Sequence, residues 1–138
     1  THLINQKKFL QNATALLKRN GKFVLGDWMV SKNITNSEWN EYVKPVVGGM
    51  LMSNSYSIST YIKWFEEYGY IISYAEDITS HTIKTWDVTL SIIKNRAIWK
   101  LAYKEGAEFI NFLRSINAIK RAMQNDKILY GVIIAEKL

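Results

Sequence analysis

One carboxylate directly follows a short apolar run. In the stretch NGKFVLGDWMVS, residues 20–31, Asp27 comes after the run 23–26 and before Trp28. Ligands of open α/β sheets gather outside the carboxyl ends of the strands, so a carboxylate at such an end would face a ligand. Asp also favours turns that leave a strand. Asp27 is therefore either ligand-facing or turn-forming, and its position alone does not separate the two.

The two histidines are the other side chains suited to proton transfer. His2 precedes a helix start and could act as a general base, although a lone imidazole near a terminus more often caps a helix or is solvated. His81 has the same ambiguity with less context. The chain contains no Cys, which excludes disulfides and thiolate metal sites. We therefore predict no metal site.

Several large side chains could line an apolar pocket, although each taken singly is more typical of an ordinary core. These residues are Trp28, Met50, Met52, Tyr56 and Trp86. No Walker-type loop, His-Glu-x-x-His, Gly-x-Ser-x-Gly or Gly-x-Gly-x-x-Gly motif accompanies them. The residues alone indicate a soluble α/β segment with a carboxylate at its rim.

Hydrophobic periodicity predicts the elements that position these residues. Apolar residues at three- and four-residue spacing predict a helix over 5–19, and the run 23–28, apolar on both faces, predicts a strand of a parallel sheet. Ser57 is placed as the N-cap of a helix that ends at Gly69. A second strand follows over about 70–77.

The segment between these units is too long and too apolar for an idle linker. Thr35 and Glu38 are spaced as a capping box for a short helix. Loops of this kind are usually functional lids or disordered inserts, and we expect a lid over about 31–56.

The C-terminal part completes an α/β pattern with inserted helices. A long helix from about 85 through Leu101 and a second helix after Gly106 predict cap helices over about 85–124. A strand rich in branched residues follows over 128–135. With three strands in view, the strand at 23–28 would keep an open edge. We expect residues outside this chain, or another chain, to cover it.

The net charge of +6 could suggest an anionic partner such as nucleic acid or a membrane. The Lys and Arg residues are scattered and interleaved with Glu, which favours a solvated surface over a nucleic-acid footprint. The sequence has no long apolar run and no signal-peptide form. We expect a cytoplasmic protein without a membrane segment.

Three stretches carry a resemblance to a known family. FLQNATALLKRNGKFVLGDW is similar to its helix, turn and fifth strand, YIKWFEEYGYIISYAEDIT to its helix, turn and sixth strand, and ILYGVIIAEKL to its closing strand. Together they resemble the C-terminal half of class I S-adenosylmethionine-dependent methyltransferases. Within them the chain most resembles the small-molecule branch with tocopherol C-, sugar O- and glycine or sarcosine N-methyltransferases. Arg19-Asn20 and Lys137-Leu138 depart from the family's usual Lys-Pro or Arg-Pro pairs.

The resemblance implies an α/β fold: the fifth, sixth and seventh strands of a seven-stranded Rossmann-like sheet with lid and cap helices. Residues 1–138 would be the acceptor-side part of the domain, and the N-terminal half, with its glycine-rich cofactor loop, would be absent. A missing half or a companion chain would complete the sheet. This chain would then be a fragment, inactive alone.

The resemblance also implies a reaction and its residues. The intact enzyme would transfer a methyl group from S-adenosylmethionine to a small-molecule acceptor. Asp27 and His2 would face the acceptor as acid–base or orienting groups, and the lid and cap helices would cover it. The alternative is a non-catalytic methyltransferase-like interaction module that binds nucleic acid or serves as a scaffold.

Overall fold

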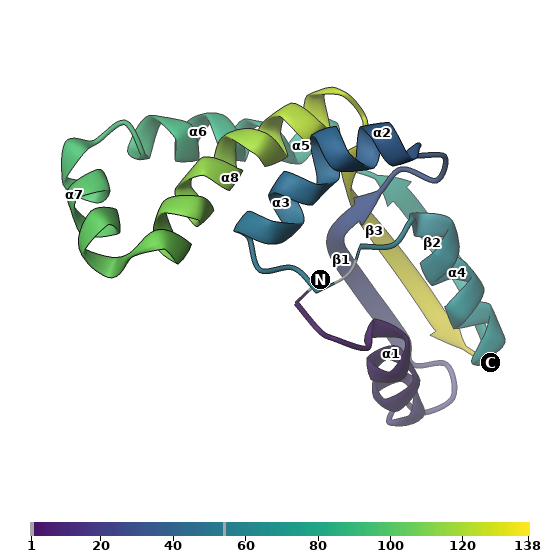
Figure 1. The fold of residues 1–138 in the computed structure, drawn as a ribbon. Helices are drawn as coiled ribbons and strands as arrows, with labels where there is room; N and C mark the ends of the chain where they lie inside the picture. The colour runs from purple at the N-terminus through teal and green to yellow at the C-terminus, as the bar shows by residue number, and fades with distance from the viewer. Residues whose placement is uncertain (1, 54) are drawn as a thin grey trace.

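The computed structural model describes residues 2–53 and 55–138, so Thr1 and, within the predicted lid, Asn54 lie outside the described residues. Their centre is a sheet with the strand order β1-β3-β2 (Figure 1). The strands are β1 (Lys22–Val30), β2 (Tyr70–Asp77) and β3 (Ile128–Lys137). The three predicted strands are therefore confirmed, and β1 and β3 each extend two residues beyond their predicted C-terminal ends.

The predicted parallel pairing of β1 is wrong. Both β1 and β2 pair antiparallel with β3, which lies between them. The two outer strands are parallel to each other, but they are not adjacent. A strand that is apolar on both faces can be covered on both faces. This pattern does not determine whether the neighbouring strand is parallel or antiparallel.

Two helices cover one face of the sheet, which we call the helix-covered face. On this face β1 places Phe23, Leu25, Asp27 and Met29, since side chains alternate along a strand. The helices are α1 (Gln6–Ala15) and α4 (Ile58–Glu67). Together they form a core whose buried members are Leu10, Met29, Tyr61, Phe65, Tyr70, Ile133 and Ala135.

Both helices begin at side-chain caps. The Asn5 side chain accepts a hydrogen bond from the amide of Lys8, and the predicted cap Ser57 accepts one from the amide of Thr60. The first helix ends at Ala15, four residues before the predicted end at residue 19. Leu16, which lies beyond the last helical residue, is 87% exposed.

The other face of the sheet is covered at one end only, and we call it the half-open face. It carries Val24, Gly26, Trp28 and Val30 of β1. The helices on this side of the sheet are α2 (Asn36–Glu38), the π-helix η1 (Trp39–Val43), α3 (Lys44–Gly49), α5 (Thr79–Thr82), α6 (Lys84–Ile92), α7 (Arg96–Glu105) and α8 (Ala107–Gln124). The last three form an arm that extends away from the sheet, with α7 at its far end (Figure 1).

The predicted long helix from about residue 85 is wrong as one element. It is two helices, α6 and α7, separated by residues 93–95. The Asn95 side chain accepts a hydrogen bond from the amide of Ala97 at 2.9 Å and so caps α7. The apolar period continues across this break, which is why periodicity alone joined the two helices.

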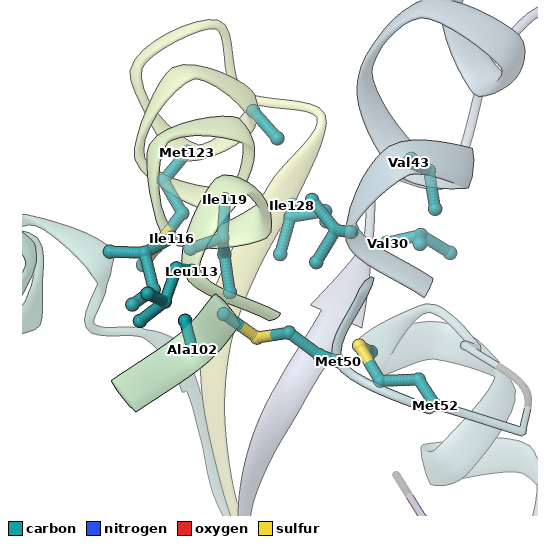
Figure 2. Close-up of a cluster of buried hydrophobic side chains, with 12 residues drawn as sticks. Val30, Val43, Met50, Met52, Ala102, Leu113, Ile116, Ile119, Met123 and Ile128 are labelled. Carbon is teal, nitrogen blue, oxygen red and sulfur yellow. The ribbon is translucent and has the colours of Figure 1, made fainter. Parts of the chain in front are cut away.

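The predicted lid segment contributes to the core. The capping box is confirmed, because Thr35 Oγ1 accepts from the amide of Glu38 and Glu38 accepts from the amide of Thr35. Farther along, α3 packs against α8 through Gly49, where an added Cβ would lie 2.3 Å from the Cβ of Ser115. Figure 2 shows the apolar side chains that this segment shares with β1, α7, α8 and β3.

The far end of the half-open face lacks a cover from the described residues. Val24 pairs with Ile134, and Ile134 pairs with Tyr74, so the three side chains form a row across the sheet. Val24 is 65% exposed, Tyr74 41% and the nearby Ile71 47%. The strand that carries Val24, β1, is at the edge of the sheet, as the sequence predicts. An apolar row beside an edge strand is a surface that another part of a protein can cover.

Candidate active site

Asp27 lies within β1, three residues before the strand ends at Val30. It is partly buried on the helix-covered face, opposite Gly131 of β3. The amide of Trp28 donates to its Oδ1 at 2.8 Å. The expectation that the strand ends at Trp28, which would place Asp27 at its mouth, is thus corrected. Asp27 is a strand residue near the carboxyl end of an edge strand.

An aromatic cluster lies on the same face as Asp27. The ring centroids of Tyr56 and Trp64 are 4.7 Å apart, and those of Tyr61 and Trp64 are 5.4 Å apart. Burial, and after it the negative charge of Asp27, raise the pKa of the Tyr61 phenol. Tyr61 therefore stays protonated, and its hydroxyl donates to Oε1 of buried Gln6. Asp27 thus lies beside aromatic rings and a neutral phenol.

The structure does not join His2 to Asp27 by an ion pair within the part of the chain that it describes. His2 is exposed, and its Nδ1 lies 3.2 Å from the carbonyl oxygen of Leu51. Nearby, Ser53 Oγ donates to the carbonyl of Leu3 at 2.5 Å. These contacts hold the N-terminal segment against the end of the lid segment. His81 is exposed at the short helix α5.

The other predicted pocket residues divide between the two faces of the sheet. Tyr56 belongs with Asp27, whereas Trp28 lies on the half-open face with its ring centroid 5.6 Å from that of Trp86. Met50 and Met52 are 6% and 5% exposed in the core of Figure 2. An ordinary core role describes both methionines, and a role of any of the five in binding an acceptor stays a prediction.

Sequence reasoning missed part of the surroundings of Asp27. The inward positions of Tyr61 and Trp64 follow from the period of the helix over 58–67. The burial of Gln6 has no such signal, because an amide in the first turn of a helix is usually exposed. The hydrogen bond from Tyr61 compensates the cost of burying it.

The described residues offer no metal site and no membrane span. Among residues 2–53 and 55–138, no three His, Asp or Glu side chains gather closely enough to hold a metal ion. No helix in the same ranges has the length and apolar character needed to cross a bilayer.

Comparison with known proteins gives no match by sequence. No protein-family model matches the chain, and no curated protein matches it.

Solved structures match it by fold. A protein described as a sarcosine dimethylglycine methyltransferase, from Galdieria sulphuraria, aligns with a TM-score of 0.78 at 19% identity, over 99% of this chain and 48% of its own. A cyclopropane synthase from Mycobacterium tuberculosis aligns with a TM-score of 0.76 at 12% identity, over 96% of this chain and 50% of its own.

A third solved structure also matches by fold at low sequence identity. Phosphoethanolamine N-methyltransferase 2 of Haemonchus contortus aligns with a TM-score of 0.71 at 15% identity, over 96% of this chain and 30% of its own. The chain thus spans half or less of the length of these proteins. The described residues have the fold of the C-terminal portion of S-adenosylmethionine-dependent methyltransferases.

Proposed function

We propose that this chain is the acceptor-side part of an enzyme that transfers a methyl group from S-adenosylmethionine to a small molecule. The observation that carries the proposal is the fold match over 96–99% of the chain to methyltransferases that are at least twice as long. One of them is crystallised with phosphomonomethylethanolamine and S-adenosylhomocysteine, which are a small molecule and a product of the cofactor.

The residues of this chain do not fit the cofactor by themselves. A dinucleotide-type fold holds such a ligand on a glycine-rich loop that follows a strand. Gly48 and Gly49 lie inside the helix α3, and Gly49 is in contact with α8. We therefore assign the cofactor to a part of the enzyme outside this chain.

The edge position of β1 and the row of Val24, Ile134 and Tyr74, in which Val24 and Tyr74 are exposed, support a division of the enzyme into two parts. Further strands would pair with β1, and further helices would cover the row, which removes both an unpaired edge and an apolar surface from water. The chain contributes the last strands, the lid segment and the arm.

Asp27 is the residue of this chain best placed to act on an acceptor. It is a carboxylate near the carboxyl end of the edge strand, where ligands of open α/β sheets bind. If the acceptor is a hydroxyl, Asp27 with His2 would accept or orient its proton. If the acceptor is an amine or an activated carbon, the same groups would only position it.

The experiment is a methyl-transfer assay of the complete enzyme against amines, phenols and sugars. We expect turnover with one of these classes. For a hydroxyl acceptor, Asp27→Asn should lower kcat by roughly 100- to 10,000-fold, the range for loss of a general base, with cofactor affinity unchanged. Asp126→Asn, which removes an exposed carboxylate from the turn before β3, should change neither quantity.

Two results would contradict the proposal. Tight S-adenosylmethionine binding by this chain alone in calorimetry would overturn the division of labour. Lack of transfer to every acceptor class, together with salt-dependent binding of DNA or RNA, would instead support the non-catalytic interaction module.

A further inference from the structure

The arm contains a cavity of about 650 Å³ that Asp27 does not line. Its walls come from α6, the connection to α7, the first turns of α7 and the middle of α8. Residues of the three strands do not line it in the described part of the chain. Its volume is in the range of pockets that bind small molecules, which is roughly 300–1,000 Å³.

One side of this arm cavity is apolar. Leu90, Ile93, Trp99 and Leu113 contribute to it, and Leu113 is 3% exposed. The Trp99 indole Nε1 donates to the carbonyl oxygen of Ile93 at 2.7 Å, across the connection between α6 and α7. The hydrogen bond fixes the ring, so the apolar wall is formed without a ligand.

The other side of the arm cavity carries an excess of positive charge. Lys94, Arg114 and Lys120 line it, against the single carboxylate Asp87. Lys120 is paired with Asp87 across α8 and α6. The side chains of Lys94 and Arg114 make no hydrogen bond or ion pair with another residue in the ranges 2–53 and 55–138. Two cationic groups are therefore available to a ligand.

We propose that the arm cavity binds a small amphiphilic anion, with a carboxylate or phosphate at Lys94 and Arg114 and an apolar body against Trp99. A guanidinium pairs with carboxylate and phosphate oxygens through two parallel hydrogen bonds, and the lysine adds a point charge. The apolar wall removes the body of the ligand from water. The site does not include Asp27, because the cavity is lined by residues of the arm alone, whereas Asp27 lies in β1 on the helix-covered face.

The test uses matched ten-carbon probes with the full-length protein. Decanoate and decyl phosphate carry the two candidate anions, decyltrimethylammonium carries a cation on the same chain, and inorganic phosphate lacks the chain. Binding is measured by calorimetry and by quenching of tryptophan fluorescence. We expect the two anionic probes to bind roughly tenfold or more tightly than either of the others, as the added charge or apolar contact requires.

Variants locate the site. Lys94→Gln and Arg114→Gln should each weaken decanoate binding roughly five- to tenfold, the effect of one charge-assisted hydrogen bond. Lys100→Gln removes an equal charge from an exposed position of α7 outside the cavity and should leave binding unchanged. Trp99→Phe should abolish the quenching while calorimetry still detects binding, and Asp27→Asn should leave both unchanged.

Three outcomes would overturn the proposal. Equal binding of decyltrimethylammonium would show that charge does not select the ligand. Equal binding of inorganic phosphate and decyl phosphate would show that the apolar wall does not take part. Equal weakening by Lys94→Gln, Arg114→Gln and Lys100→Gln, with circular dichroism unchanged, would show a general effect of net charge in place of a site.

Discussion

The two faces of the sheet differ in how completely the chain covers them. On the helix-covered face, α1 and α4 enclose Phe65 and Met29, both 0% exposed, and the buried polar side chain of Gln6 has a partner. On the half-open face, the lid segment and the arm build a core at one end, and Val24 remains 65% exposed at the other. The chain thus completes one layer of an α/β sandwich and leaves the other half finished.

This difference predicts which residues stabilise the chain itself and which residues contact another part of the protein. Residues of the helix-covered face should determine the stability of the chain itself, because their contacts all lie within it. Residues at the bare end of the half-open face should contribute little until another part of the protein covers them. Each prediction below changes one side of this comparison.

The largest effect is expected at Phe65, at the centre of the helix-covered face. Its ring contacts those of Phe23 and Tyr70, at centroid distances of 5.6 and 6.1 Å. Phe65→Ala should lower the free energy of unfolding by about 3–5 kcal/mol in urea titrations, through lost burial and a cavity. Phe112→Ala is the control, because Phe112 is 41% exposed on the arm and should cost about 1 kcal/mol or less. Equal losses would contradict the contrast between the two regions.

The next effect concerns the packing of the lid segment on the arm. Gly49→Ala should lower the free energy of unfolding by about 1–3 kcal/mol, since the new methyl group meets Ser115 Cβ and the helices must separate. Gly48→Ala is a matched control in the same helix, where an added Cβ meets no atom within 4 Å. Gly48→Ala should stabilise by up to about 1 kcal/mol through helix propensity. Similar effects of the two substitutions in thermal unfolding would refute this account.

The sequence predicts the individual helices and strands better than it predicts their arrangement in the sheet. The strands, the capped helices at Thr35 and Ser57 and the helix after Gly106 follow from local patterns, and the structure confirms them. The antiparallel insertion of β3 between β1 and β2 does not follow from local patterns, because strand order depends on contacts distant in sequence.

The candidate site was predicted in part for the same reason. Asp27 and Trp28 are neighbours in sequence, so alternation along β1 sends them to opposite faces. A single pocket lined by both side chains would need them on the same face, which alternation along a strand that continues to Val30 does not allow. The continuation to Val30 depends on pairing with Ile128, which lies 98 residues away in the chain. The residues around Val30 therefore do not predict this pairing.

A smaller effect is expected in the titration of Tyr61 on the helix-covered face. Burial, and to a lesser extent the charge of Asp27, raise the pKa of its phenol above 10. Asp27→Asn should therefore lower the pKa of Tyr61 while leaving it above its ordinary value, as measured by ultraviolet difference spectra or NMR. Because the unfolded chain ionises near pH 10, Tyr61 stabilises the fold below that pH and the contribution declines above it. A Tyr61 pKa identical in the variant would mean that the two side chains do not interact.

The smallest effect lies where the lid segment meets the turn before β3. Glu38 accepts from the Lys127 ammonium at 2.6 Å and from the amide of Thr35 at 2.9 Å, and these bonds lower the pKa of its carboxyl to about 2. A folded pKa below the unfolded value near 4.5 means that the ionised group stabilises the folded state. This contribution is complete above about pH 4.5 and is lost as pH falls through about 2.

Glu38→Gln should therefore remove the acid-dependent opening of the segment, measured as amide exchange protection at residues 35–39 between pH 2 and 5. The amide keeps an acceptor for the capping box, so the variant isolates the charge. Glu41→Gln removes a neighbouring carboxylate that pairs with Arg121 on the arm and leaves the capping box intact. If Glu38→Gln kept the acid dependence and Glu41→Gln abolished it, the arm would anchor the lid segment through Arg121, and the turn before β3 would not.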